Sequence, residues 1–193
     1  MAFLELQKIL DKQIAQESKA QIRKAFQKSF QKKKNEMIAE FLNHPVTIEL
    51  KSGIISQNIS GTLGGDGNLF SFIGFQSGDD PIGPILKKLQ EISFEQDGVS
   101  IRKINYRVNM PLAAEIFAET PLPYFSGRSW AKGIETGISG LGFYLKKKSK
   151  SSRSGLGIQT KNKVRKKGVK FRNTKYISFL LKKYEIEFKN LQI

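Results

Sequence analysis

The residues of this chain with the clearest chemical potential are its lysines and arginines, which are concentrated in the last third. Residues 128–193 carry 18 Lys and Arg against 3 Glu, whereas residues 1–127 have a net charge of +1. The densest stretch, from Lys146 to Lys175, holds 13 basic residues and no acidic one. Self-repulsion on that scale opposes compact folding unless an anion lies nearby. The charge distribution therefore predicts an anionic partner, either nucleic acid or an acidic protein surface.

Two clusters make up this stretch, and Lys147, Arg153, Lys166 and Arg172 represent them as candidate partner-binding residues. Each neutralised phosphate would add roughly 0.9 to the salt dependence of duplex binding. Aromatic residues are sparse here, which argues against a stacking platform for single strands, and no base-reading motif is present. Docking on an acidic protein surface is the favoured interpretation. Sequence-independent binding of nucleic acid and a merely solvated surface stay open.

Residues suited to catalysis or metal binding are few. The chain has no cysteine and a single histidine, His44, which lies where a helix should end before Pro45. A metal site would need His44 together with carboxylates, and Glu40 is the one local candidate. The glycine-rich residues 61–68 lack the Gly-Lys-Ser/Thr ending of a phosphate-binding loop and the GxGxxG spacing. We therefore expect no catalytic site, no bound metal and no cofactor.

Trp130, which follows Arg128 and Ser129, has two interpretations. Trp and Arg are common in the hot spots of protein interfaces, so Trp130 is a candidate partner-binding residue. The alternative is a core tryptophan at the start of a helix that Ser129 caps. The sequence slightly favours the core position.

A long helix is the first element expected to carry these residues. Residues 1–40 contain neither Gly nor Pro, and apolar residues recur at multiples of four. The predicted stripe consists of Leu6, Leu10, Ile14, Ile22, Phe26 and Phe30, and it is renewed by Met37, Ile38, Phe41 and Leu42. An amphipathic helix of this length would span roughly 60 Å, and Pro45 would end it. We expect its stripe to pack on the core or on neighbouring subunits.

Short strands are predicted after this helix. Alternating apolar residues predict a strand over 46–50, and a continuous apolar run predicts a buried strand over 69–75. Asp97-Gly98 lies between two alternating pairs, which predicts the turn of a hairpin.

Shorter helices are predicted from capping residues. One should start where Asp80 precedes Pro81, a second should cover 111–119, and a third should follow Ser129. Residues 184–188 suit a last helix and a strand equally, because their alternation is short.

The chain is thus expected to have three parts: a long N-terminal helix (1–44), an α+β core (45–145) and a basic arm (146–193). The predicted class is α+β, with the long amphipathic helix packed on a small, mostly antiparallel β-sheet and a basic C-terminal extension. No signal peptide is apparent, and no apolar run approaches the ~20 residues that span a bilayer. A soluble protein assembled inside a cell is expected, without a membrane partner.

Several segments stand out when they are considered together: residues 44–47, 60–65, 67–75, 127–130, 140–142 and 152–155. They resemble a virion structural protein of contractile-tailed, marine-type bacteriophages. The expected order of elements is also similar to that of neck and tail-completion proteins of tailed phages, which usually place an arginine before a Thr-Gly pair. This chain has Asn58-Ile59-Ser60 there instead.

The resemblance implies a non-enzymatic structural role, in which copies form a ring at the neck, or head–tail junction, of a virion assembled in the host cytoplasm. The implied partners are further copies of the chain and other virion proteins, such as connector, portal or tail subunits. The charge supports an alternative, a sequence-independent nucleic-acid-binding protein such as a DNA-packaging or DNA-end factor.

Overall fold

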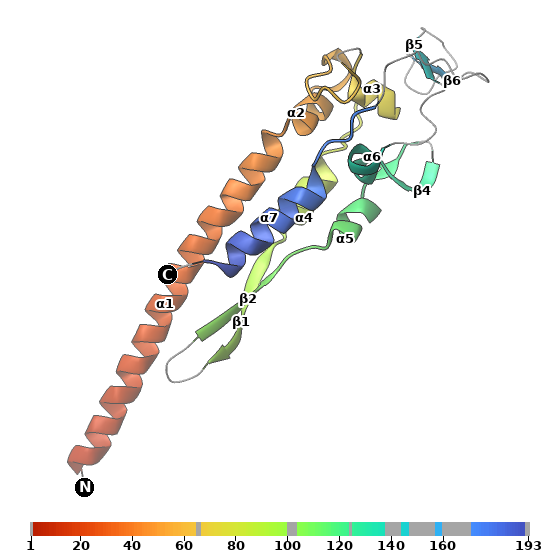
Figure 1. Ribbon diagram of the computed structural model, residues 1–193. Helices are drawn as coiled ribbons and strands as arrows, with labels where there is room; N and C mark the ends of the chain where they lie inside the picture. The colour runs from red at the N-terminus through yellow and green to blue at the C-terminus, as the bar shows by residue number, and fades with distance from the viewer. Residues whose placement is uncertain are drawn as a thin grey trace.

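The chain is arranged along one long helix, and the body of the protein lies beside the carboxyl-terminal half of that helix (Figure 1). The computed structural model describes residues 2–64, 67–99, 104–123, 125–137, 144–146, 157–159 and 171–191. In the first helix, the side chains are described from Gln16 onward. No helix in those ranges is long and apolar enough to cross a membrane.

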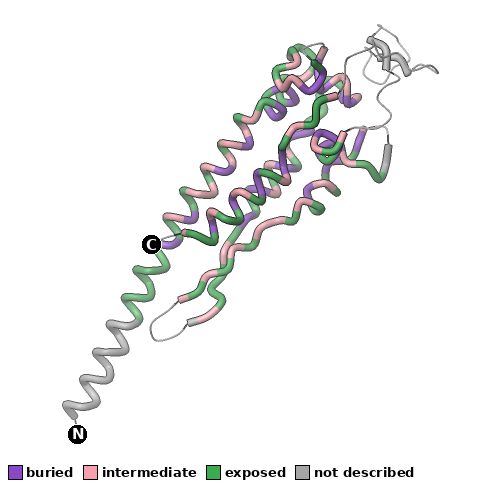
Figure 2. The backbone as a smooth tube through the Cα atoms, viewed as in Figure 1, coloured by how far each residue is buried: buried purple, intermediate pink, exposed green. Residues whose placement is uncertain are grey.

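The first helix, α1, runs from Ala2 to Leu42 and confirms the predicted long N-terminal helix. Phe26, Phe30, Met37 and Phe41 are buried, as the stripe predicts. Residues 16–25 are all exposed, and Figure 2 shows this section extending beyond the body of the protein. Among the described side chains of α1, those that pack in the core therefore begin at Phe26.

Two segments that were predicted as strands are helices. α2 covers Pro45–Lys51, with the His44 side chain as its N-cap and Pro45 at its first position. α3 covers Leu69–Ile73 between the capping side chain of Asn68 and Gly74, which has a left-handed φ of 99°. Both predictions were wrong because caps decide the conformation of such short apolar segments more strongly than alternation does. A 3-10 turn, η1 (Gly53–Ile55), and turns join the two helices.

The helix predicted at Asp80-Pro81 is α4, which covers Gly83–Gln90. The Asp80 carboxylate accepts hydrogen bonds from the backbone N–H groups of Ile82 (3.1 Å) and Gly83 (2.9 Å), so it still fastens the start of the helix. A Cβ at position 83 would collide with the Asp80 carboxylate, so any larger residue there would require the Asp80 side chain to move.

The hairpin is formed by β1 (Ser93–Val99) and β2 (Ile104–Asn109), which pair antiparallel. The predicted turn at Asp97-Gly98 was wrong, because these residues lie within β1, where the register shifts between Gln96 and Gly98. The Asp97 carboxylate forms an ion pair with Arg107 across the hairpin at 2.7 Å. The Asp-Gly pair is therefore accommodated within the strand as a bulge-like irregularity.

The remaining central elements are α5 (Ala113–Ala118), β3 (Pro121–Leu122), β4 (Phe125–Ser129) and α6 (Trp130–Thr136). α5 confirms the helix predicted over 111–119. α6 confirms the helix predicted after Ser129, whose hydroxyl accepts a hydrogen bond from the Lys132 N–H at 3.0 Å. β5 (Tyr144–Lys146) pairs antiparallel with β6 (Gly157–Gln159). All the described strand pairs are antiparallel, as predicted.

The last helix, α7, covers Ile177–Lys189, so residues 184–188 are helical and do not form a strand. It packs along α1, where the rings of Phe30 and Phe188 lie 5.4 Å apart and Lys33 forms an ion pair with Glu187 at 3.0 Å. The described end of the predicted basic arm is thus part of the core.

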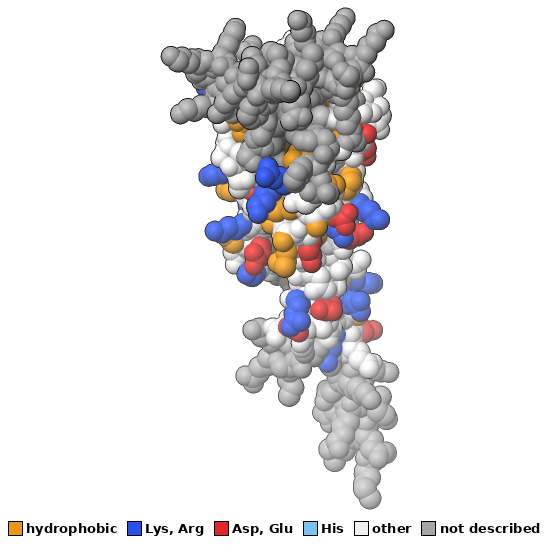
Figure 3. All heavy atoms as spheres, turned by 90° about the vertical axis from the view of Figure 1, so that its right-hand side faces the viewer, with side chains coloured by type: hydrophobic (Ala, Val, Ile, Leu, Met, Phe, Trp, Pro, Cys, Tyr) orange, Lys and Arg blue, Asp and Glu red, His pale blue; other side chains and the backbone are white. Residues whose placement is uncertain are grey.

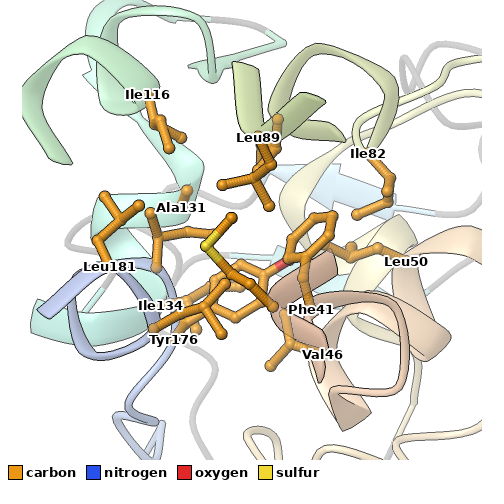
Figure 4. Packing of buried hydrophobic residues seen from close by; sticks show 14 of the residues in the cluster. Phe41, Val46, Leu50, Ile82, Leu89, Ile116, Ala131, Ile134, Tyr176 and Leu181 are labelled. Carbon is orange, nitrogen blue, oxygen red and sulfur yellow. The ribbon is translucent and has the colours of Figure 1, made fainter. Parts of the chain in front are cut away.

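The buried cluster draws residues from each of the helices α1 to α7, and Figure 4 shows part of it. Phe41 of α1, Leu89 of α4, Ile134 of α6 and Leu181 of α7 are among its members. Close to the hairpin, Phe26 stacks on Tyr106 with ring centroids 4.1 Å apart, and this contact holds the hairpin against α1. The described body is therefore one packed unit.

Candidate partner-binding surfaces

The predicted basic residues lie mostly beyond the part of the chain that the structure describes: Lys147, Arg153 and Lys166 are outside the described residues. Arg172 is described and exposed, and its backbone N–H donates a hydrogen bond to the Thr62 carbonyl at 2.9 Å. The end of the basic stretch is therefore fixed to the body by its backbone, which leaves the Arg172 side chain on the surface.

The segment 138–170, which holds most of the basic stretch, starts and ends at neighbouring points of the body. A Cβ added at Gly137 would lie 3.4 Å from the Asn173 side-chain oxygen. The Thr174 N–H also donates a hydrogen bond to the Ile134 carbonyl at 3.1 Å. Residues 137 and 173 are thus side by side, although 35 residues separate them in the sequence.

The predicted packing residues of α1 separate into two groups. Phe26 and Phe30 are core residues, whereas the side chains of Leu6, Leu10 and Ile14 lie outside the described residues. Helix residues 16–25 are exposed throughout. We call residues 2–25 of α1 the stalk, because this section of the helix extends past the body in Figure 1.

Trp130 is not a surface anchor. Its side chain is 1% exposed and packs edge-on against Phe75, with ring centroids 5.9 Å apart, and near Tyr176 at 6.4 Å. The candidate partner-binding role is corrected to the core position that the sequence slightly favoured. The cause is its place as the first residue of α6, whose apolar side faces the body.

His44 connects the end of α1 to the start of α7. Its Nδ1 accepts a hydrogen bond from the Val46 N–H at 3.2 Å, and its Nε2 lies 3.1 Å from the Lys175 carbonyl oxygen. The neutral ring with hydrogen on Nε2 satisfies both contacts. Burial of the ring lowers the pKa of His44, against opposing effects of the Lys175 carbonyl and the Glu40 carboxylate. Both nitrogens are engaged, so neither is free to act as a metal ligand or a base in this structure.

A cleft of about 260 Å³ opens beside His44, between the end of α1 and the start of α7. Phe41, Tyr176 and Leu180, all buried, supply its apolar lining. Glu40 and Phe179 are among the residues around it. The volume is several times the ~30 Å³ that one water molecule occupies, so the cleft can accept a side chain.

The Glu40 carboxylate beside the cleft is already paired. Its Oε2 accepts hydrogen bonds from the Lys183 ammonium (2.6 Å) and the Tyr184 hydroxyl (2.8 Å). Burial tends to raise the pKa of Glu40, but these two hydrogen bonds outweigh it and hold the pKa below the ordinary value. Burial and the neighbouring Glu40 raise the pKa of Tyr184, so its hydroxyl stays protonated.

One face of α7 points away from the core and combines apolar and basic side chains. Phe179 and Ile186 are 50% and 53% exposed, and Lys175, Lys182 and Lys189 are exposed as well. Phe179, Lys182, Ile186 and Lys189 follow each other at steps of three and four, which places them in one line along the helix. Lys175 precedes the helix and reaches the same face, where its ammonium lies 5.0 Å from the centre of the Phe179 ring. We call these five residues the α7 outer face. Sequence reasoning missed it, because it requires 184–188 to be helical.

A second feature that sequence reasoning missed is the buried carboxylate of Glu49 in α2. Its Oε1 accepts from the Leu69 N–H (2.7 Å) and its Oε2 from the Ser60 N–H (2.9 Å). The Asn58 amide donates to both oxygens, at 3.0 and 3.1 Å. Glu49 therefore fastens the loop between α2 and α3 from inside, and on this loop Ile55 is 91% exposed.

No group of three or more His, Cys, Asp or Glu residues within the described ranges could hold a metal ion. On the face shown in Figure 3, basic and acidic side chains alternate over the described body, with hydrophobic side chains between them. Comparisons with protein-family models, curated proteins and solved structures found no match. The surfaces described above are therefore the basis for a functional proposal.

Proposed function

We propose that the protein is a non-enzymatic structural protein that joins a larger assembly through exposed helical surfaces and its cationic segment. The observation that carries this proposal is the stalk, in which residues 16–25 of a 41-residue helix have no buried member. Helices in proteins gain most of their stability from packing an apolar face. A stalk that extends past its own body is consistent with packing on another subunit.

The assembly that we propose is a phage virion, with the protein as a ring component at the neck or tail-completion stage. This setting rests on the sequence resemblance to virion structural proteins. Further copies of the chain and other virion proteins would be its partners. Head-to-tail contacts whose rotation closes produce rings, and the stalk gives each copy an extended surface for such a contact.

A second candidate function is sequence-independent binding of nucleic acid. The observation that favours it is the run of 13 basic residues without an acidic one between Lys146 and Lys175. Phosphate contacts by such a run would make affinity fall steeply with salt.

Measuring the mass of the purified protein in solution separates the two functions. Sedimentation would be recorded over a range of protein concentrations and salt concentrations, with and without duplex DNA. Two deletions are informative: removal of residues 2–15 from the stalk, and replacement of 138–170 by a short Gly-Ser linker. Because Gly137 and Asn173 are adjacent, the second deletion should leave the body intact.

The assembly proposal expects defined oligomers that persist at moderate salt and that the stalk deletion reduces. A protein that stays monomeric at every concentration, and binds duplex DNA through 138–170 with a steep salt dependence, would refute it in favour of the nucleic-acid function. The stalk deletion should not affect such DNA binding. Under the assembly proposal the stalk deletion reduces the oligomers, whereas under the nucleic-acid proposal the 138–170 replacement reduces DNA affinity.

A further inference from the structure

We propose that the α7 outer face, together with the cleft at its amino-terminal end, binds an amphipathic helix that carries acidic residues beside its apolar stripe. The inference rests on the proposed assembly function and names the kind of partner for one of its surfaces. The partner is identified by this chemistry, an apolar stripe with acidic flanks, which complements the lysines of the α7 outer face.

The apolar part of the argument is the spacing of Phe179 and Ile186. Both side chains are about half exposed, and they lie seven residues apart on a regular helix. Seven residues make two helical turns, so the two side chains form one seam on the outside of α7. Large apolar side chains aligned in this way are typical of a helix that receives a second helix.

The charged part of the argument is the row of lysines beside this seam. Lys182 and Lys189 are exposed and also lie seven residues apart on the helix, and the exposed Lys175 lies beside Phe179 just before the helix begins. Glu185 forms an ion pair with Lys189 at 2.7 Å, so Lys175 and Lys182 supply the positive charge beside the seam. Acidic residues on a partner complement these two lysines.

The cleft supplies an anchoring position at the start of the seam. Phe179 belongs to both the seam and the cleft, and the Lys175 ammonium lies 5.0 Å from the centre of the Phe179 ring. The polar groups of Glu40 and His44 are satisfied within the protein, as described above. Apart from Lys175, the remaining lining is apolar, so the cleft suits a leucine or an aromatic side chain of the partner helix.

A protein helix fits these observations better than nucleic acid does. Phosphate groups would be attracted by the lysines, but they would leave the exposed side chain of Ile186 without a contact. An apolar stripe with acidic flanks satisfies both kinds of residue at once.

The test uses the full chain and a labelled synthetic peptide. The peptide is about three heptads long, with leucine at the first and fourth heptad positions and glutamate at the flanking positions. A sister peptide carries lysine in place of each glutamate. Fluorescence anisotropy gives the Kd of each peptide for the wild type, Phe179→Ala, Ile186→Ala and the matched control Leu112→Ala, which removes an exposed leucine ahead of α5.

The glutamate peptide should bind at least about tenfold more tightly than the lysine peptide, which reflects the charge of the face. Phe179→Ala and Ile186→Ala should each raise its Kd at least about fivefold, and Leu112→Ala should leave it unchanged. The double variant Lys182→Glu with Lys189→Glu should reverse the preference between the two peptides. Because all these residues are exposed, the variants should keep the circular dichroism spectrum of the wild type.

Three results would overturn the inference: no binding of the glutamate peptide, binding that neither alanine variant weakens, or equal affinity for both peptides. A labelled DNA duplex whose affinity falls with Phe179→Ala as much as that of the peptide would assign the face to nucleic acid instead. Sedimentation of the same variants keeps the two proposals apart. Normal oligomers without peptide binding would refute only the α7 partner, whereas a chain that neither assembles nor binds would refute both.

Discussion

Glu49 is predicted to be the most sensitive polar residue of the body. Its side chain is fully buried and accepts four hydrogen bonds, two from backbone N–H groups and two from the Asn58 amide. Glu49→Gln replaces one carboxylate oxygen by an NH2 group. In either orientation of the new side-chain amide, its NH2 group faces another donor, the backbone N–H of Ser60 or that of Leu69.

The expected loss follows from the number of donors that remain unsatisfied. One buried N–H without an acceptor costs roughly 1–3 kcal/mol, so Glu49→Gln should lower the free energy of unfolding by about 2 kcal/mol. Glu49→Ala leaves both backbone N–H groups and the Asn58 amide without acceptors, and we expect a loss of about 3–5 kcal/mol. Native domains are stable by roughly 5–15 kcal/mol, so the alanine variant should approach global unfolding.

Urea unfolding followed by circular dichroism measures this loss at neutral pH. Glu91→Gln is the matched control, because Glu91 is half exposed and its nearest cation, Lys88, is 3.8 Å away. The control should stay within about 0.5 kcal/mol of the wild type. If Glu49→Gln were equally neutral, the reasoning would be refuted, because the three donor groups aimed at the buried carboxylate could not then depend on both of its oxygens as acceptors.

Three further predictions concern the body. Phe30→Ala should lower the free energy of unfolding by about 3–5 kcal/mol in the same urea assay, because Phe30 is buried between Phe94 and Phe188; a loss below 1 kcal/mol would mean that α1 does not pack as described. Because the pKa of His44 is lower in the folded state than in the unfolded state, the unfolded chain takes up a proton on His44 at a higher pH than the folded chain does. The free energy of unfolding should therefore fall as the pH drops below about 6.5, by at most about 1.4 kcal/mol per pH unit. His44→Asn keeps a capping side chain without this titration, so the wild type should lose stability relative to it between pH 7 and the lowered pKa; parallel pH profiles would contradict the assignment. Lys34→Met should lower stability by about 1 kcal/mol in thermal unfolding, because the Lys34 ammonium donates to the carbonyls of Gln90 (2.5 Å) and Ile92 (2.7 Å) after α4; an unchanged midpoint would show that water replaces it fully.

Elements with strong local signals could be predicted from the sequence. α1 lacks Gly and Pro throughout, and α6 follows the capping side chain of Ser129. α4 begins at Gly83, two residues after the predicted Pro81, with Ile82 as its N-cap and the Asp80 carboxylate bound to the backbone at its start. The segments around α2 and α3 carry short apolar alternation, which helix and strand share over so few residues. Their caps, His44 and Asn68, were the deciding signals.

The candidate surfaces were harder to predict because they depend on contacts between distant parts of the chain. The donors to Glu49 come from residues 9, 11 and 20 positions further along, so its burial has no local signature. The α7 outer face needs the helical assignment of 184–188, which periodicity left open. The cleft needs α1 and α7 side by side, and these two helices lie at opposite ends of the sequence.

The closeness of Gly137 and Asn173 makes the body independent of what connects them. Closing a loop whose length doubles costs only about 0.6 kcal/mol more, so longer or shorter versions of the connection should fold on the same scaffold. Related chains can therefore differ widely in this region without repacking their cores. The same junction is a natural position for inserting a fluorescent reporter, which would leave both the stalk and the last helix in their native places.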